Sequence, residues 1–193
     1  MMPKILVLPG SIRSGSFNIR LAAAAATALA GQGADVTRIS LEDYPLPIMD
    51  QDLQEREGIP ENAMQLGRMI AAHDGLFIAS PEYNSSIPPL LKNAIDWVSR
   101  INSDRGRPFR PWTGRIIGLG AASNGRFGGV RCLYHLRAVL MSVRAEVITA
   151  QCAISGAAQA FDDDGHIIDE RARLALDGTC QALIAHCSAL MAR

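Results

Sequence analysis

The sequence predicts an α/β fold in which a doubly wound parallel sheet of five strands carries helices on both faces. Short apolar segments alternate with helical segments five times along the chain, as in parallel sheets joined by right-handed crossovers. The first apolar segment, Lys4–Leu8, is apolar without a break after Lys4, which is typical of a central strand covered on both sides. Polar or glycine-rich loops follow the first, third and fourth strands, at the edge of the sheet where ligands bind.

Length and composition set limits on the kind of protein. The 193 residues fit one domain, spanning residues 1–193. The formal net charge of zero argues against a nucleic-acid partner, because no basic excess exists to neutralise phosphates. No segment approaches about 18 continuous apolar residues, and Ile5–Leu8 is too short for a signal peptide, so we expect no membrane span. Four cysteines without Cys-x-x-Cys spacing are interpreted as buried free thiols of a cytoplasmic protein.

The elements are expected in a regular order. The expected strands are Lys4–Leu8, Asp35–Ser40, Gly75–Ala79, Arg115–Ala121 and Glu146–Ala150. The expected helices are Phe17–Ala30, Glu61–His73, Pro88–Ile101, Val130–Val143 and Asp169–Met191. Leu41–Pro60 is expected to form a long surface excursion, and Asn102–Gly114 a loop. The acidic run Asp162–Gly165 lacks the spacing and final glutamate of a calcium loop, so we interpret it as a turn and expect no metal.

The first loop has the features of a phosphate site. A strand, a loop of small residues and a helix N-terminus bring free N–H groups and the positive end of a helix dipole to one anion. The candidate ligands here are Ser11, Arg13, Ser16 and Asn18. Ser16 stands where a triphosphate loop requires lysine, and the dinucleotide fingerprint is absent, so we expect a site for one phosphate monoester. The alternative is a helix capped by Ser14 or Ser16, with Arg13 in solvent.

The second loop, Ser80–Ile87, is suited to a planar ring. Tyr83 and the backbone beside it can lie against the ring while the amides pair with its polar edge. The alternatives are that Tyr83 is an ordinary core aromatic and that Glu82 is a solvated charge. The third loop, Ser123–Gly129, would close over the other edge of the ring. The expected strand order 2-1-3-4-5 reverses between the first and third strands, where such sheets bind their ligands.

These residues resemble a known family. The stretches Gly10–Asn18, Pro81–Asn84 and Leu91–Trp97 are similar to motifs of the NAD(P)H-dependent FMN reductases, and Gly128–Arg137 resembles the bacterial quinone and chromate reductases among them. The resemblance implies a flavodoxin-like fold, a tightly bound FMN, and NADPH or NADH as hydride donor. It implies that the phosphate and ribityl chain are held by Ser11, Arg13, Ser16, Phe17 and Asn18. It also implies that the isoalloxazine is lined by Pro81, Glu82, Tyr83, Asn84 and Ser123.

The function implied by this resemblance is that of a flavoprotein oxidoreductase. Hydride from NAD(P)H would reduce FMN, and electrons would then pass by ping-pong to a small-molecule acceptor such as a quinone, an azo compound, chromate or free flavin. Because the flavin carries the chemistry, no catalytic side chain is expected. The alternatives are an FMN-binding electron carrier, against which the neutral charge counts, and a non-catalytic flavin-binding protein. Arg126 and Phe127 are bulkier than we expect in the third loop, which leaves the acceptor open.

Two helices also predict self-association. Beside the stripe that docks on the sheet, Pro88–Ile101 carries a second apolar stripe made of Leu90, Trp97 and Ile101. Val130–Val143 likewise carries a second stripe made of Val130, Tyr134 and Met141. Exposed apolar patches usually mark an interface, so we expect a homodimer or homotetramer, as the resemblance also implies. The alternative is that the excursion Leu41–Pro60 covers the second stripes within one chain.

Overall fold

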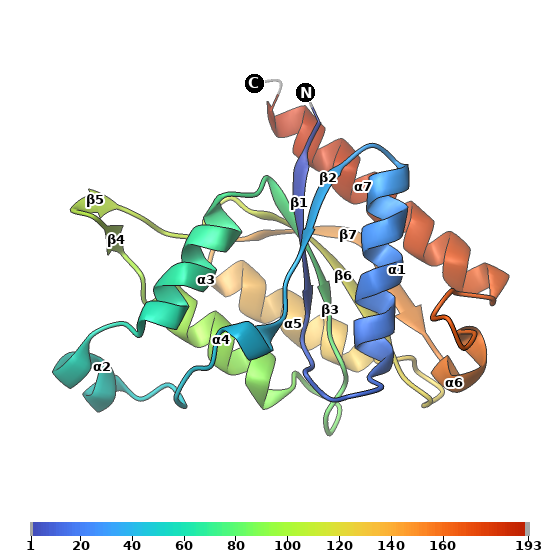
Figure 1. Cartoon of the computed structure of the whole chain (residues 1–193), viewed down its shortest axis with the longest axis horizontal. Coiled ribbons are helices and arrows are strands. Elements are labelled where there is room, and N and C mark those ends of the chain that lie inside the picture. The colour runs from blue at the N-terminus through green and yellow to red at the C-terminus, as the bar shows by residue number, and fades with distance from the viewer. Residues whose placement is uncertain (1, 192–193) are drawn as a thin grey trace.

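A parallel sheet of five strands in the order β2-β1-β3-β6-β7 forms the centre of the protein (Figure 1). A computed structural model describes residues 2–191. The strands of the sheet are β1 (Lys4–Pro9), β2 (Asp35–Arg38), β3 (Gly75–Ala79), β6 (Ile116–Ala122) and β7 (Glu146–Ile154). All four pairings are parallel. Numbered among themselves, these strands have the predicted order 2-1-3-4-5, so the expected topology is confirmed.

Helices lie on the two sides of this sheet (Figure 1). The longer helices are α1 (Phe17–Gly31), α3 (Glu61–Ala71), α4 (Pro89–Ser99), α5 (Val130–Ser142) and α7 (Glu170–Met191). On β1, Ile5 and Val7 belong to a core shared with α1 and α7, whereas Leu6 and Leu8 belong to a core shared with α3, α4 and α5. Because successive side chains of a strand point to opposite faces, the sheet has one core on each face.

Local sequence explains how the two helices next to the loops begin. Ser16 is the N-cap of α1, and its hydroxyl oxygen accepts a hydrogen bond from the Asn18 N–H at 3.3 Å. Helix α4 starts at Pro89 with Pro88 as its cap, so proline occupies a position whose N–H would have no helical partner. Both helices therefore start at fixed points directly after the loops that follow β1 and β3.

The segments expected to be irregular contain short elements. The excursion after β2 holds η1 (Leu41–Asp43) and α2 (Gln51–Glu57), and the 102–114 segment, expected to be a loop, contains the hairpin of β4 (Ser103–Asp104) and β5 (Arg107–Pro108). Strand β7 continues four residues beyond the expected Ala150, and α6 (Ala157–Ala160) follows it. The four cysteines are buried and free, as predicted. Among residues 2–191, no helix has both the length and the apolar character needed to cross a bilayer.

The second stripe of α4 is not an exposed patch. Trp97 is 0% exposed and Ile101 is 2% exposed within one chain. The Trp97 indole N–H donates to the Pro47 carbonyl at 2.7 Å, so the excursion after β2 covers this side of the helix. The prediction that Leu90, Trp97 and Ile101 form a free interface is therefore wrong, since Trp97 and Ile101 are buried, and the alternative is correct for Trp97. On α5 the second stripe does remain open, since Tyr134 is 61% exposed and Met141 is 60% exposed.

Candidate functional site

Three loops meet around one hollow at the carboxyl ends of β1, β3 and β6. We call them loop 1 (residues 10–16), loop 2 (residues 80–88) and loop 3 (residues 123–129). The hollow has a volume of about 150 Å³. Nine of the ten residues predicted to bind the cofactor line it, together with Ala122 and Asn124; the exception is Asn84. The fold thus brings together residues that lie more than 100 positions apart in the sequence, from Ser11 to Ser123.

Loop 1 leaves several backbone donors free. Among the described residues, the N–H groups of Ser14, Gly15 and Phe17 have no protein acceptor. They lie at the N-terminus of α1, where the helix dipole adds partial positive charge. Ser16 is the N-cap of α1, as the alternative interpretation required. The free N–H groups are donors that this cap does not use, so the loop can also bind an anion. This donor set fits a phosphate group.

Hydroxyl groups and one guanidinium complete loop 1. Ser11 is buried, and its hydroxyl oxygen accepts the Arg13 N–H at 3.3 Å while lining the hollow. The Arg13 side chain is exposed and donates to the Ser14 carbonyl at 3.1 Å, which leaves most of its five N–H donors available. Positive charge and hydroxyl donors therefore converge on the same hollow as the free backbone N–H groups.

Asn18 ties loop 1 to loop 3. Its side-chain amide donates to the Ala122 carbonyl at 2.9 Å, and its amide oxygen accepts the Ala122 N–H at 2.9 Å. Asn18 is 2% exposed. Because these two bonds engage both ends of the amide, its direct role is to hold the first turn of α1 against the end of β6. Its role as a cofactor ligand stays a prediction.

Loop 2 presents Tyr83 on a tight turn. The Tyr83 N–H donates to the Ser86 carbonyl at 3.0 Å, and the Ser86 N–H donates back to Tyr83 at 2.9 Å. Between them, Asn84 has φ 49° and Ser85 has φ 66°, so both central residues are left-handed, as in a two-residue type I′ turn. Tyr83 is 48% exposed, so the alternative that it is a core aromatic is wrong.

Glu82 fastens loop 2 to α5. Its carboxylate, whose side chain is 9% exposed, accepts hydrogen bonds from Arg131 Nε at 2.9 Å and from the Cys132 N–H at 3.2 Å. Burial opposes ionisation of Glu82, but the hydrogen bonds from Arg131 and Cys132 outweigh it and lower the pKa of the carboxyl below its ordinary value. The alternative that Glu82 is a solvated charge is therefore wrong.

Two residues of α5 that sequence reasoning did not single out also support the site. The Arg131 guanidinium lies 5.3 Å from the centre of the Phe127 ring. The cation that pairs with Glu82 of loop 2 therefore also contacts loop 3. His135 Nδ1 lies 2.9 Å from the Ser86 hydroxyl and makes a second link between loop 2 and α5. Only the family resemblance of Gly128–Arg137 covered these two residues, because charge pairs between distant segments leave no periodic signal in a sequence.

Loop 3 reaches α5 through two glycines that admit no side chain. A Cβ on Gly128 would lie 2.8 Å from the Ile154 carbonyl carbon, and a Cβ on Gly129 would lie 2.7 Å from the Ala121 Cβ. Both glycines also have positive φ, at 59° and 87°. The loop is held at its other end because the Asn124 side-chain oxygen accepts the Ala158 N–H at 2.8 Å. Loop 3 is therefore a fixed wall of the hollow.

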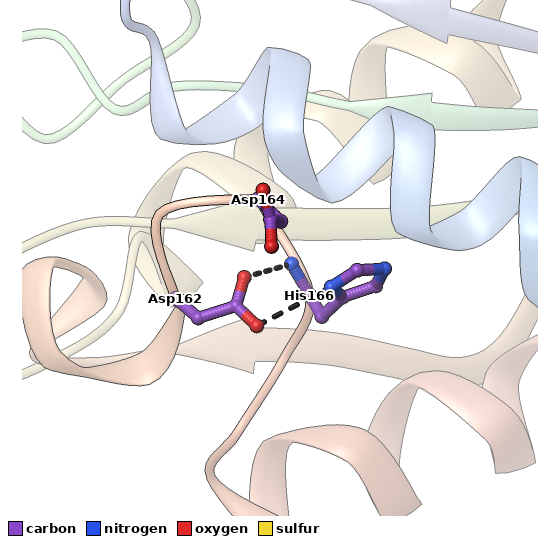
Figure 2. A group of neighbouring side chains, drawn as sticks. All are labelled: Asp162, Asp164 and His166. Carbon is purple, nitrogen blue, oxygen red and sulfur yellow. Dashed lines mark hydrogen bonds and ion pairs between the residues drawn. The ribbon is translucent and has the colours of Figure 1, made fainter.

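A separate group of potential metal ligands, shown in Figure 2, is explained by the turn that contains it. Ligand atoms of Asp162, Asp164 and His166 lie within 4.8 Å of one another. The Asp162 carboxylate accepts the His166 N–H at 2.7 Å and lies 3.3 Å from His166 Nδ1. Gly165 has φ 87°, and the flanking residues Phe161 and Ile167 form a β-bridge. The predicted turn is confirmed, and Asp162 closes it.

Comparison with known proteins identifies the family. Residues 3–159 match the family described as NADPH-dependent FMN reductase. The chain belongs to this family. It is 37% identical to the quinone reductase of Escherichia coli K12 over 170 residues, which cover 86% of each chain. It is also 36% identical to an NAD(P)H-dependent FMN reductase of Pseudomonas aeruginosa over 182 residues, 93% of this chain and 92% of the relative.

Solved structures agree with this membership. FerB, a flavoenzyme NAD(P)H:(acceptor) oxidoreductase of Paracoccus denitrificans, superposes with a TM-score of 0.80 at 26% identity, over 97% of this chain and 98% of FerB. A short-chain flavodoxin superposes with a TM-score of 0.62 at 12% identity, over 97% of this chain and 99% of that chain, which shows the shared fold alone. The resemblance drawn from the three sequence motifs is thereby confirmed.

Proposed function

We propose that this family member holds FMN across loops 1, 2 and 3 and transfers reducing equivalents from NAD(P)H to a quinone-class small molecule. The observation that carries the proposal is the single hollow lined by nine of the ten predicted binding residues. One side of it offers the unpaired donors of loop 1, and another offers the exposed ring of Tyr83. That combination suits a ligand with a phosphate at one end and a planar ring at the other.

The residues of loop 1 act on the phosphate end. When bound, FMN supplies the redox chemistry, accepting hydride from a nicotinamide and delivering electrons to an acceptor. Arg13 supplies a charge-assisted hydrogen bond, which is about twice as strong as a neutral one. Ser11 and Ser16 supply hydroxyl groups, and the N–H groups of Ser14, Gly15 and Phe17 add neutral donors along the helix axis. Such a set distinguishes a phosphorylated flavin from riboflavin.

The residues of loop 2 act on the ring end. Among the described residues, the N–H groups of Glu82 and Asn84 have no protein acceptor, so they are available to the polar edge of a ring. Backbone donors fixed in advance stabilise negative charge without reorganising. The pairing of Glu82 with Arg131 fixes the backbone from which these donors project. In this proposal, no side chain of the protein transfers a proton or forms a bond.

We also propose a homodimer or homotetramer, now on the basis of α5 alone. Tyr134, Met141 and Phe127 are exposed apolar side chains on this helix and the loop before it. An exposed apolar face of this kind is typical of a self-complementary interface. Light scattering at micromolar concentration tests this proposal. A monomer would contradict the assembly, and this result does not depend on whether the protein binds FMN.

One purification and one assay test the proposed activity. We expect yellow protein that releases FMN on denaturation, and oxidation of NADPH or NADH when 1,4-benzoquinone is added. Running both nucleotides in parallel measures the preferred donor. Bound FMN without turnover contradicts the reductase and supports the electron-carrier or non-catalytic alternative. Protein that neither contains nor takes up FMN contradicts the cofactor assignment itself.

A further inference from the structure

An apolar cavity lies next to the three-loop site. It has a volume of about 350 Å³ and lies between α4 and the segment after β2. Its apolar walls include Ile12 of loop 1, Leu41 and Leu46 of that segment, and Leu90 of α4. We call it the Leu46 cavity. Leu90 belongs to the second stripe of α4, whose other two members are covered, so the stripe ends in an open apolar space.

The Leu46 cavity connects with the proposed flavin site through shared walls. Ile12 and Leu90 also line a second hollow of about 210 Å³, which contains Ser11, Arg13 and Tyr83. Those three residues in turn line the three-loop hollow. We call the middle space the Tyr83 hollow. A molecule whose polar head lies in the Tyr83 hollow can therefore extend an apolar substituent past Ile12 and Leu90 into the Leu46 cavity.

The outer wall of the Leu46 cavity is fixed in place. Asn93 of α4 donates from its side-chain amide to the Pro47 carbonyl at 2.9 Å and accepts the Met49 N–H at 2.8 Å. The Trp97 indole N–H donates to the same Pro47 carbonyl at 2.7 Å. Three hydrogen bonds thus hold the segment after β2 against α4, directly beyond Leu46. A cavity with an anchored wall is pre-formed, as most small-molecule sites are.

The chemistry of the lining selects an uncharged, mainly apolar occupant. Among residues 2–191, no lysine or arginine lines the Leu46 cavity, and the one carboxylate in its lining, Glu42, disfavours anions such as chromate. The Tyr44 hydroxyl adds a polar group to the lining. Ile12 is 46% exposed at the entrance, where an apolar ligand would cover it. The Tyr83 hollow, where the exposed Tyr83 ring lies beside Pro88 and Pro89, would take the quinone ring instead.

We infer that the Leu46 cavity binds the hydrocarbon substituent of a quinone acceptor, so that the chain is selective for alkyl- or isoprenyl-substituted quinones. The inference rests on the proposed function, because it places the quinone ring at the Tyr83 hollow. The overall reaction is unchanged. The quinone gains a hydride equivalent that originates from NAD(P)H and a proton from solvent, and leaves as the hydroquinone, while NAD(P)H becomes NAD(P)⁺.

The test compares two acceptors in matched variants. We measure kcat/KM for decyl-substituted benzoquinone and for unsubstituted 1,4-benzoquinone with the flavin-loaded protein. Leu46→Trp fills the cavity and should lower the decyl-to-unsubstituted ratio roughly tenfold, the range for a lost apolar subsite. Ile48→Trp is the control, since Ile48 belongs to the same segment, does not line the cavity and is 86% exposed. Leu46→Ser, a smaller polar change, tests the same subsite should the tryptophan variant fail to fold.

A binding measurement separates this inference from the proposed function. Calorimetric titration with the decyl quinone should give a dissociation constant about tenfold higher for Leu46→Trp than for Ile48→Trp. If the decyl quinone binds in this Leu46-dependent way but is never reduced, the proposed function fails and the cavity assignment stands. Equal ratios and equal affinities in the folded variants overturn the inference. It is also overturned if Leu46→Trp changes only the oligomeric state, because a second copy of the chain then occupies the cavity.

Discussion

Loops 1 and 2 hold their shapes in opposite ways. Loop 1 is closed by short-range contacts, such as the Ser16 N–H donating to the Arg13 carbonyl at 3.1 Å, and leaves its remaining donors unpaired. Loop 2 is fastened from outside, by Arg131 and Cys132 on Glu82 and by His135 beside Ser86. An anion site needs free donors, whereas a platform for a ring needs a backbone that cannot move. The two loops meet these different requirements on neighbouring strands.

The largest effect is expected where Asn18 joins loop 1 to loop 3. Asn18→Ala removes both hydrogen bonds to Ala122 and leaves a buried N–H and a buried carbonyl without partners. We expect the free energy of unfolding to fall by about 3 kcal/mol, as each orphaned group costs roughly 1–3 kcal/mol. Urea denaturation measures this change. Asn102→Ala, at an exposed asparagine, is the control, and an equal loss in both variants contradicts the joining role of Asn18.

Removing the charge of loop 1 should affect the ligand and not the fold. Arg13→Ala is expected to weaken FMN binding by roughly tenfold or more, since a hydrogen bond to a charged group contributes about 1.5–3 kcal/mol. Riboflavin lacks the phosphate, so its affinity should stay the same. Fluorescence titration with both flavins at moderate salt measures the difference. Equal weakening for FMN and riboflavin would place Arg13 at the ring instead.

Removing the Arg131 side chain, which holds loop 2, should affect the fold and not the discrimination between ligands. Arg131→Ala removes the guanidinium and leaves the Glu82 carboxylate with backbone N–H donors only, among them the Cys132 N–H at 3.2 Å. The Arg131 side chain is half exposed, so we expect a loss of only about 1 kcal/mol in unfolding free energy. A double-mutant cycle with Glu82→Gln isolates the pair, and Arg126→Ala controls for the loss of a loop cation. FMN-to-riboflavin discrimination should be unchanged, and a collapse of it would contradict the division of roles.

The smallest effect is the loss, at low pH, of the stabilisation that comes from the Glu82–Arg131 pair. The folded-state pKa of Glu82 lies below its ordinary value of 4.5. Just below pH 4.5, Glu82 is therefore protonated in the unfolded chain but still ionised in the folded chain. The stabilisation from Glu82 is therefore complete above that pH and is lost as pH falls through the folded-state pKa. Subtracting the stability curve of Glu82→Gln from that of the wild type cancels the other carboxylates. A flat difference between pH 3 and pH 6 contradicts the pairing.

The parts of the protein that depend on local chemistry could be predicted from the sequence. The apolar runs of β1 and β3, the small residues of loop 1 and the prolines before α4 each determine the structure within a few positions. The pairing of Trp97 with Pro47, 50 positions away, and of Glu82 with Arg131, 49 positions away, could not be found in this way. Strand β7 was predicted too short because its second half includes Gln151, a polar residue that a periodicity search reads as the end of a strand.

Helix α7 has a consequence for how the chain is made. It is the last element, yet it packs on the core that β1 and α1 begin, and Cys187 lies so close to Gly75 that a Cβ there would approach its sulfur to 2.5 Å. During synthesis, the part of this core face on β6 and β7, on which α7 packs, stays uncovered until α7 leaves the ribosome. A nascent chain that stalls before α7 therefore displays an apolar sheet face, which is the surface that chaperones and proteases recognise. Completion of this core face therefore requires the 22 residues of α7.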